Sequence, residues 1–178
     1  QSYFDHPGSL TILSLAATYR ALHALGLIEI VSFAQLPPAL DVAAFEAAMT
    51  ALLRWGRLYS LITGLALLAF LGDGSTLRGG PYKQNIKDGV TWLKSQQQEN
   101  GLFGTNASHD FIYNHAIAAY AMCEAFGLSK YTLLKPVAQK GVNYLESHRN
   151  PYSVWRYQPR DNDNDTSVTG WCIMAYES

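Results

Sequence analysis

Apolar residues recur at helical spacing in two otherwise polar stretches of the chain. In IKDGVTWLKS, Ile86, Val90 and Leu93 are separated by four and three residues, which places them on one helix face. Most of the remaining positions are polar, so the opposite face is expected to meet water. The stretch 137–145 repeats this pattern, and Pro136 precedes it where the first turn of a helix tolerates proline. Both stretches predict amphipathic helices.

A third stretch is apolar on almost every side. Between Ala116 and Phe126, Glu124 is the only charged residue. A helix with this composition has to be covered all round, because no face of it is suited to water. The stretch therefore predicts an internal helix.

These stretches belong to an internal repeat. The sequence IKDGVTWLKSQQQENGLFG matches AQKGVNYLESHRNPYSVWR, with Gly89 aligned on Gly141 and Phe103 on Trp155, each pair 52 residues apart. The apolar stretches recur at a similar step, beginning at Thr11, Thr63, His115 and Thr169, with the first copy the weakest. A unit of about 50 residues, with one amphipathic and one apolar helix, is expected to recur along the chain.

The repeat predicts an all-α fold in two layers. Amphipathic helices lie outside and apolar helices inside, and short connections make consecutive helices antiparallel. All inner helices then point the same way, with Thr63, His115 and Thr169 near their N-terminal ends. In the divergent first part, residues 8–27 are expected to form an inner helix and residues 41–56 an outer one. About seven helices and no sheet are expected, in a single domain of residues 1–178 whose first 59 residues are a divergent repeat.

Composition and charge limit the partners and the kinds of protein that the chain can represent. The formal charge of −1 and the 15% of charged residues provide no basic surface for phosphates, so nucleic acid is excluded as a partner. Cys123 and Cys172 lie in apolar runs and are expected to be buried. His23, Glu29 and two prolines interrupt the apolar region 21–40, which argues against a membrane span. No motif predicts a cofactor, and the compartment is left open.

The ends of the chain suggest a piece of a longer protein. The sequence begins with Gln1 rather than methionine, and it stops at Ser178 within an expected helix. We therefore expect further repeats in the parent sequence.

The repeats resemble those of a known superfamily. GVTWLKSQQQENGLFG and GVNYLESHRNPYSVW each read as an outer helix followed by a turn and an aromatic residue, and YNHAIAAYAMCEAFG and DTSVTGWCIMAYES read as inner helices. Over residues 60–178 this pattern resembles the squalene-cyclase-like repeats of the terpenoid cyclase and protein prenyltransferase superfamily, as found in bacterial prenyltransferase and squalene-oxidase repeat proteins. The resemblance implies an α/α-toroid. A full ring takes about six hairpins and this chain has room for about three and a half, so a second copy completing the ring is one expectation.

The resemblance also directs attention to an Asp-rich stretch, DNDNDTSVTGW. Class II cyclases of this superfamily use a DxDDT-type motif, whose central carboxyl protonates the substrate. Aligned on Asp165 and Thr166, this chain carries Asn164 where the central acid would be, and an amide has no acidic proton to donate. The resemblance makes Asp165 and Asp163, together with His115, the candidate catalytic residues, although the acid position itself is an amide.

Two metal sites are alternatives for the same stretch. The zinc site of prenyltransferases uses Asp, Cys and His, and Asp165, Cys172 and His115 supply these types without the Asp-x-Cys spacing. Asp161, Asp163 and Asp165 match positions 1, 3 and 5 of a calcium loop, but Cys172 stands where the bidentate glutamate belongs. No metal is therefore predicted, with calcium as the remaining candidate. The structural alternative is that Asp165 or Thr166 caps the next helix.

An apolar cavity is the last candidate site. Its expected lining is Tyr113, Asn114, Tyr120, Trp155 and Trp171. The leading interpretation is a non-catalytic scaffold that binds an apolar or isoprenoid small molecule or a protein partner. The alternative is an isoprenoid-handling enzyme of the cyclase or prenyltransferase type.

Overall fold

A computed structural model describes residues 20–27, 41–106 and 111–178 of the chain. The expected first helix, residues 8–27, lies mostly outside these residues. The chain divides into two compact units, residues 1–59 and 60–178, and each is considered by itself. In the first unit, residues 20–24 are helical, and the Asp41 carboxylate accepts a 3.2 Å hydrogen bond from the N–H of Ala44. Among the described residues the regular structure is helical, which confirms the all-α prediction.

Helix α2 differs from the prediction. The sequence pattern gave an outer helix over 41–56 and a separate inner helix from Thr63, but α2 runs without interruption over Val42–Gly72. The predicted division is wrong because Gly56 is the only glycine or proline at the expected break. One glycine within a helix costs about 1 kcal/mol, which the flanking helix-forming residues offset. Residues 60–72 of α2 belong to the second unit.

The two amphipathic helices form as predicted. Helix α3 spans Lys83–Ser95 and buries Ile86, Val90 and Leu93. Helix α5 spans Lys135–His148, has Pro136 in its first turn, and follows the short 3-10 helix η3, Thr132–Leu134. The polar faces of both helices remain exposed.

Helix α4, Phe111–Ser129, is the centre of the second unit. It is apolar on nearly all sides, as predicted, and packs against α3, α5 and α6. Helix α6, Thr166–Glu177, follows η4, Pro151–Ser153, and an irregular segment. The hydroxyl of Tyr113 contacts that of Ser167 near the start of both helices, and Glu124 accepts a 2.9 Å bond from Ser178 near their ends, so α4 and α6 are parallel.

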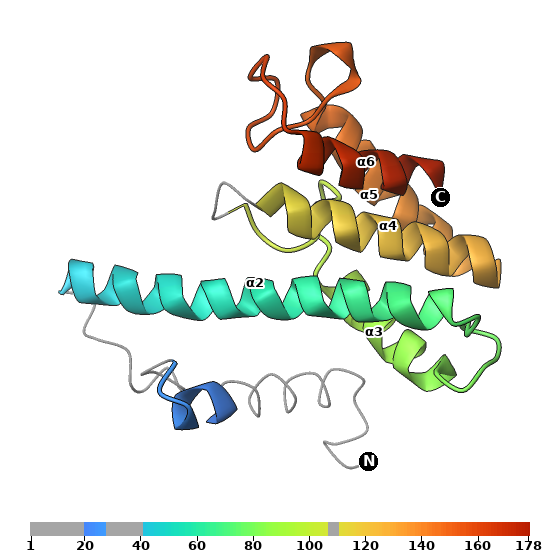
Figure 1. The fold of residues 1–178 in the computed structure, drawn as a ribbon, viewed down its shortest axis with the longest axis horizontal. Coiled ribbons are helices and arrows are strands. Elements are labelled where there is room, and N and C mark those ends of the chain that lie inside the picture. Colours follow the sequence, from blue (N-terminus) through green and yellow to red (C-terminus); the bar gives the residue numbers. More distant parts are fainter. Residues whose placement is uncertain (1–19, 28–40, 107–110) are drawn as a thin grey trace. The chain divides into compact units, whose positions relative to one another are not determined.

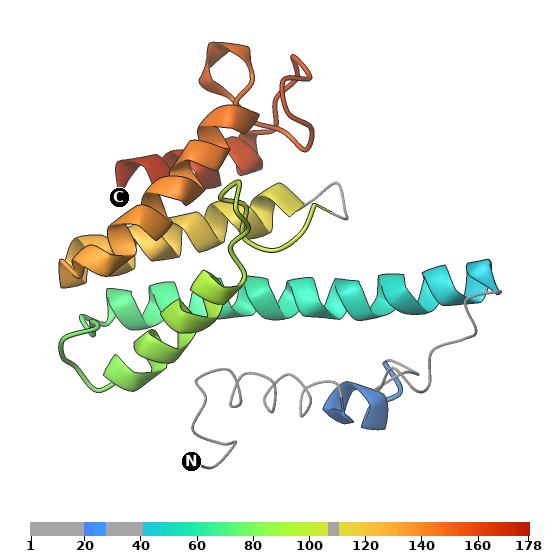
Figure 2. The same ribbon diagram turned by 180° about the vertical axis from the view of Figure 1, so that it is seen from behind.

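The second unit has two layers. The end of α2, α4 and α6 run in the same direction in one layer, while α3 and α5 lie behind them in Figure 1 and in front in Figure 2. These are the inner and outer layers that the repeat predicts. Closure into a toroid stays a prediction.

Each outer helix ends in a similar tight turn. Isolated bridges join Gln97 to Phe103 after α3 and Asn150 to Val154 after α5. The first turn requires Gly101, because its φ is +96° and a Cβ there would lie 2.2 Å from the carbonyl oxygen of Lys140. Ser153, one repeat later, also has a positive φ, 62°. The turn geometry therefore repeats although the glycine does not.

A membrane span was not expected from the sequence. Within the described part of the chain, no helix combines the length and the apolar character that crossing a bilayer requires.

Candidate functional site

Asp165 lies at the start of α6, where its carboxylate caps the helix. Oδ1 accepts hydrogen bonds from the N–H of Ser167 at 2.9 Å and of Val168 at 3.0 Å, and from the Ser167 hydroxyl at 2.6 Å. The backbone N–H of Asp165 donates to the carbonyl of Trp155 at 3.0 Å. This confirms the predicted capping role, which satisfies helix N–H groups that would otherwise lack a partner.

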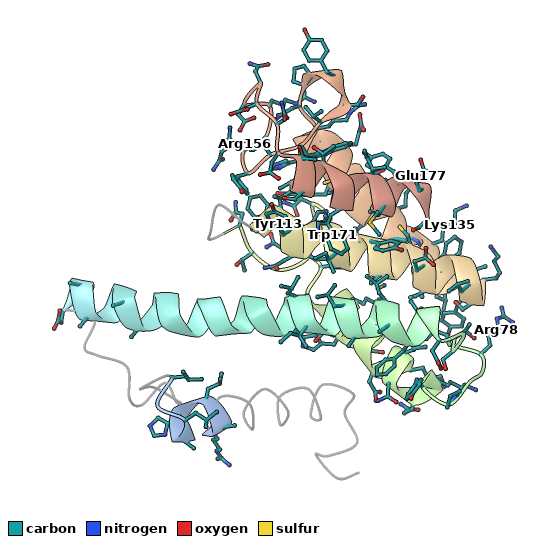
Figure 3. The ribbon with its side chains drawn as sticks, viewed as in Figure 1. Arg78, Tyr113, Lys135, Arg156, Trp171 and Glu177 are labelled. Atoms are coloured by element: carbon teal, nitrogen blue, oxygen red, sulfur yellow. The ribbon has the colours of Figure 1, made fainter. Side chains whose placement is uncertain are left out.

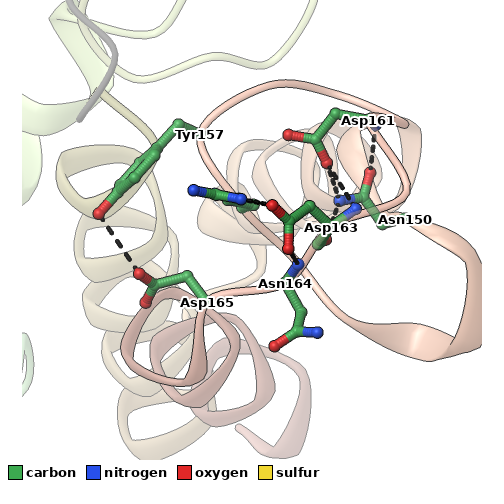
Figure 4. Close-up of polar contacts among 7 residues, drawn as sticks. Asn150, Tyr157, Asp161, Asp163, Asn164 and Asp165 are labelled. Carbon is green, nitrogen blue, oxygen red and sulfur yellow. Dashed lines mark hydrogen bonds and ion pairs between the residues drawn. The ribbon is translucent and has the colours of Figure 1, made fainter.

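Two tyrosines complete the surroundings of Asp165. The hydroxyl of Tyr113, on α4, lies 3.3 Å from Oδ1, and that of Tyr157 lies 3.3 Å from Oδ2 (Figure 4 shows the Tyr157 contact). The two rings are tilted, with centroids 6.1 Å apart. Tyr113 and Asp165 are 52 residues apart in sequence, so this cluster is created by the packing of α6 on α4.

The hydrogen bonds hold Asp165 in its ionised form. The Ser167 hydroxyl, followed by the helix N–H groups, lowers the pKa of Asp165 to about 2. A carboxyl group with this pKa carries no proton near neutral pH, so it is unsuited to protonating an alkene or epoxide. It is also a weak base. The arrangement supports helix capping and a fixed negative charge rather than proton transfer.

Asp161 and Asp163 belong to a separate network around Asn150. The Asn150 amide donates to Oδ1 of Asp161 and to the carbonyl of Asp163, both at 2.6 Å, and its own oxygen accepts from the N–H of Asp161 at 3.0 Å. The Asp163 carboxylate pairs with Arg156 and accepts a 2.8 Å bond from the N–H of Asn164. As Figure 4 shows, the Asp163 and Asp165 side chains have different partners.

The carboxylates of Asp161, Asp163 and Asp165 do not gather into one group in this structure. In the parts of the chain that the structure describes, no three His, Cys, Asp or Glu side chains group closely enough to hold a metal ion. Arg156 already balances the charge of Asp163. The carboxylates close the loop onto Asn150 and α6 instead.

His115 lies fully buried in the core, with both ring nitrogens bonded to backbone. Nδ1 accepts from the N–H of Phe103 at 3.0 Å, and Nε2 lies 3.1 Å from the carbonyl of Gly141, to which it donates. The Tyr144 ring packs edge-on against it at 4.6 Å. Burial lowers the pKa of His115 to about 3, so the imidazole is neutral. The ring's lone pair and its N–H proton are both used in hydrogen bonds to the backbone.

Cys172, the third candidate zinc ligand, is also buried. Desolvation raises the pKa of its thiol to about 12, which disfavours the thiolate that zinc binds.

The expected cavity residues divide into two groups. Trp155 is only 3% exposed, and its indole N–H donates to the carbonyl of Leu145 at 2.9 Å, so it is part of the core. Tyr113, Asn114, Tyr120 and Trp171 are only partly buried. Figure 3 shows Tyr113 and Trp171 where α4 and α6 lie side by side, on the side of the layer away from α3 and α5.

Sequence reasoning missed three residues that organise this region. Tyr157 reaches Asp165, Asn150 holds two aspartates, and Arg156 neutralises one of them. Tyr157 and Arg156 adjoin the Asp-rich stretch, so proximity was an available signal. For Asn150, the sequence offered no signal beyond its place in the turn after α5.

Comparison with protein-family models, with curated proteins and with solved structures found no match to this chain.

Proposed function

We propose that this chain is a squalene-cyclase-like repeat domain that acts as a binding scaffold without catalysis. The proposal combines the sequence resemblance with the two-layer helical repeat of the second unit. An apolar small molecule of the isoprenoid kind is the ligand. It binds against the partly exposed aromatic side chains of the inner layer, which are Tyr113, Tyr120 and Trp171.

The observation that carries the proposal is that the candidate catalytic side chains are already engaged in structural contacts. Asp165 caps α6 and stays ionised, and His115 satisfies two buried backbone groups. Asn164 occupies the position where the superfamily's acid would stand. A cyclase needs a protonated acid at the mouth of its cavity, and these residues do not provide one.

The aromatic side chains support ligand binding. Tyr113, Tyr120 and Trp171 are packed against the core yet retain exposed surface. Partly exposed aromatic rings offer a large apolar area with little loss of side-chain entropy on binding. The ionised Asp165 beside Tyr113 would repel an anionic group, so the preferred ligand is neutral, such as an isoprenoid alcohol rather than a diphosphate.

Titration with farnesol, followed by tryptophan fluorescence, tests this proposal. Saturable binding is expected, weakened by Trp171→Ala and by Tyr120→Ala. Tyr152→Ala is the matched control, because Tyr152 is 97% exposed in the turn after α5 and should leave binding unchanged. Absence of binding, or equal binding by all variants, would refute the ligand site. Conversion of farnesyl diphosphate or squalene into a cyclised product would refute the non-catalytic assignment.

A further inference from the structure

The turn after α3 contains the one asparagine of the sequence that is followed by glycine, Asn100 before Gly101. An asparagine side chain can be attacked at Cγ by the backbone nitrogen of the next residue, which closes a five-membered ring. A side chain on that next residue hinders the attack, and glycine has none. Asn100 is exposed, so water can reach the ring and ammonia can leave it. This dipeptide is therefore the one best suited to such a reaction.

A local hydrogen bond folds the Asn100 side chain over the peptide group with which it would react. The N–H of Leu102 donates to Oδ1 of Asn100 at 3.1 Å, which closes an Asx turn. In such a turn Cγ is brought near the nitrogen of the residue in between, here Gly101. Donation to Oδ1 also polarises the amide carbonyl, as hydrogen-bond donors do where an oxyanion develops. The turn therefore holds the two reacting groups close together.

Other hydrogen bonds of the same turn oppose the reaction. The N–H of Gly101 donates to the carbonyl of Gln98 at 3.0 Å, and this bond must break before the nitrogen can attack. The Gln97 side chain stabilises the turn, because Nε2 donates to the carbonyl of Gly101 at 3.3 Å and to that of Val137, on α5, at 2.9 Å. Reaction needs a brief local opening, so its rate should follow how often the turn opens.

The other asparagines are placed less favourably. Three lie within helices, whose backbone N–H groups are held by helical hydrogen bonds, and one precedes a proline, whose nitrogen has no hydrogen to lose. Three more precede residues whose side chains hinder the attack. In this order they are Asn85, Asn114 and Asn143; Asn150; and Asn106, Asn162 and Asn164.

The place of Gly101 in the fold gives the reaction a structural consequence. A Cβ on Gly101 would overlap the carbonyl oxygen of Lys140, so the main chain of the turn lies directly against α5. Opening of the ring yields aspartate or isoaspartate, and in isoaspartate the main chain runs through the former side chain and is one carbon longer. The contact with Lys140 leaves no room for this extra carbon on the side of α5.

We propose that Asn100 is a site of spontaneous deamidation, and that the isoaspartate formed there releases the turn after α3 from α5. The nitrogen of Gly101 gives up its proton and bonds to Cγ of Asn100, while the bond from Cγ to Nδ2 breaks and ammonia leaves with that proton. Water then adds to one of the two carbonyls of the cyclic imide and reopens the ring. This chemistry is independent of the proposed ligand site and does not require farnesol to bind.

Peptide mapping by mass spectrometry, after incubation of the whole chain at mildly alkaline pH, is the first test. Deamidation at Asn100 is expected to be about tenfold or more faster than at any other asparagine, because the reacting groups are already oriented. Gln97→Ala should raise the rate at Asn100 by roughly two- to tenfold, the worth of one hydrogen bond, without raising the rate at Asn106. Gln139→Ala, on the exposed face of α5, is the matched control and should change neither rate.

Three outcomes of this mapping would overturn the proposal. The first is a faster reaction at another asparagine, and the second is a rate at Asn100 that Gln97→Ala leaves unchanged. The third is an equal rise at Asn106 in Gln97→Ala, since the reaction would then follow general unfolding rather than opening of the turn.

Hydrogen exchange of the separated products tests the structural consequence. Deamidated protein is purified by ion exchange, and a methyltransferase specific for isoaspartate distinguishes the two products. The N–H of Phe103, which is bonded to His115, should exchange about tenfold or more faster in the isoaspartate form. Asn100→Asp carries the same charge without the longer main chain and should exchange like the wild type. Equal exchange in all three proteins, or equally fast exchange in Asn100→Asp, would overturn the release of the turn.

Discussion

The backbone N–H of Phe103 donates a 3.0 Å hydrogen bond to Nδ1 of His115, twelve residues later in the chain. One repeat further on, the N–H of Trp155 donates to the hydroxyl of Thr169, also at 3.0 Å. In both repeats, a side chain of the inner helix thus holds the aromatic residue that follows the turn after the outer helix. This shared role explains why a buried histidine stands where the neighbouring repeat has threonine.

His115→Leu is therefore expected to destabilise the protein. The substitution leaves the N–H of Phe103 and the carbonyl of Gly141 buried without partners, at about 1–3 kcal/mol for each group. A loss of about 2–6 kcal/mol in the free energy of unfolding should be measured by urea denaturation. His23→Leu, at an exposed position, is the control and should change stability by less than about 0.5 kcal/mol. Equal effects of the two substitutions would argue against the structural role of His115.

The same histidine predicts a dependence of stability on pH. Burial lowers the pKa of His115 from 6.5 to about 3, so below pH 6.5 the unfolded chain binds a proton that the folded chain does not. The free energy of unfolding therefore falls with acid, and burial of His148, whose pKa is also lowered, acts in the same direction. The stability advantage of the wild type over His115→Gln should narrow by about 1.4 kcal/mol per pH unit between 6.5 and 4. Urea unfolding at several pH values measures this, and a constant difference would contradict it.

Asp165 should act through capping. Asp165→Ala removes the acceptor for two helix N–H groups and should lower the melting temperature by about 4 °C, whereas Asp165→Asn keeps an acceptor oxygen and should lower it less. Folding lowers the pKa of Asp165 from 3.8 to about 2. The stability that the carboxylate contributes is therefore present above pH 3.8 and is lost as the pH falls toward 2. Calorimetry at neutral and acid pH checks both effects. A larger loss for Asp165→Asn than for Asp165→Ala would contradict the capping role.

Replacement by alanine should change the stability of the protein in opposite directions at two glycines that are equivalent in the repeat. At Gly89 the nearest atom to a new Cβ is Leu67 Cδ1 at 3.8 Å, so Gly89→Ala should stabilise α3 by about 0.5–1 kcal/mol. At Gly141 the buried ring of Phe103 lies 2.9 Å away, and overpacking there costs about 1–3 kcal/mol, more than the helix gains. We expect a net loss for Gly141→Ala, measured by thermal or urea unfolding. Stabilisation by both substitutions would show that Phe103 moves freely.

The spacing of apolar residues was sufficient to predict much of the second unit. The buried residues of α3, the all-round burial of α4 and the parallel course of the inner helices follow from which faces avoid water, a property that sequence encodes directly. The break in α2 was predicted wrongly, because one glycine does not decide between a turn and a continuous helix.

The role of the polar candidates depended on tertiary structure. The sequence placed Asp161, Asp163, Asp165 and His115 in plausible motifs, yet their chemistry depends on partners distant along the chain. Tyr113 reaches Asp165 only because α6 packs on α4, and Gly141 reaches His115 only because α5 packs behind α4. Sequence alone determined which residues are apolar, and hence the helices and their layers. Packing decided which polar groups are buried, bonded or ionised, because those properties come from neighbours that local sequence does not specify.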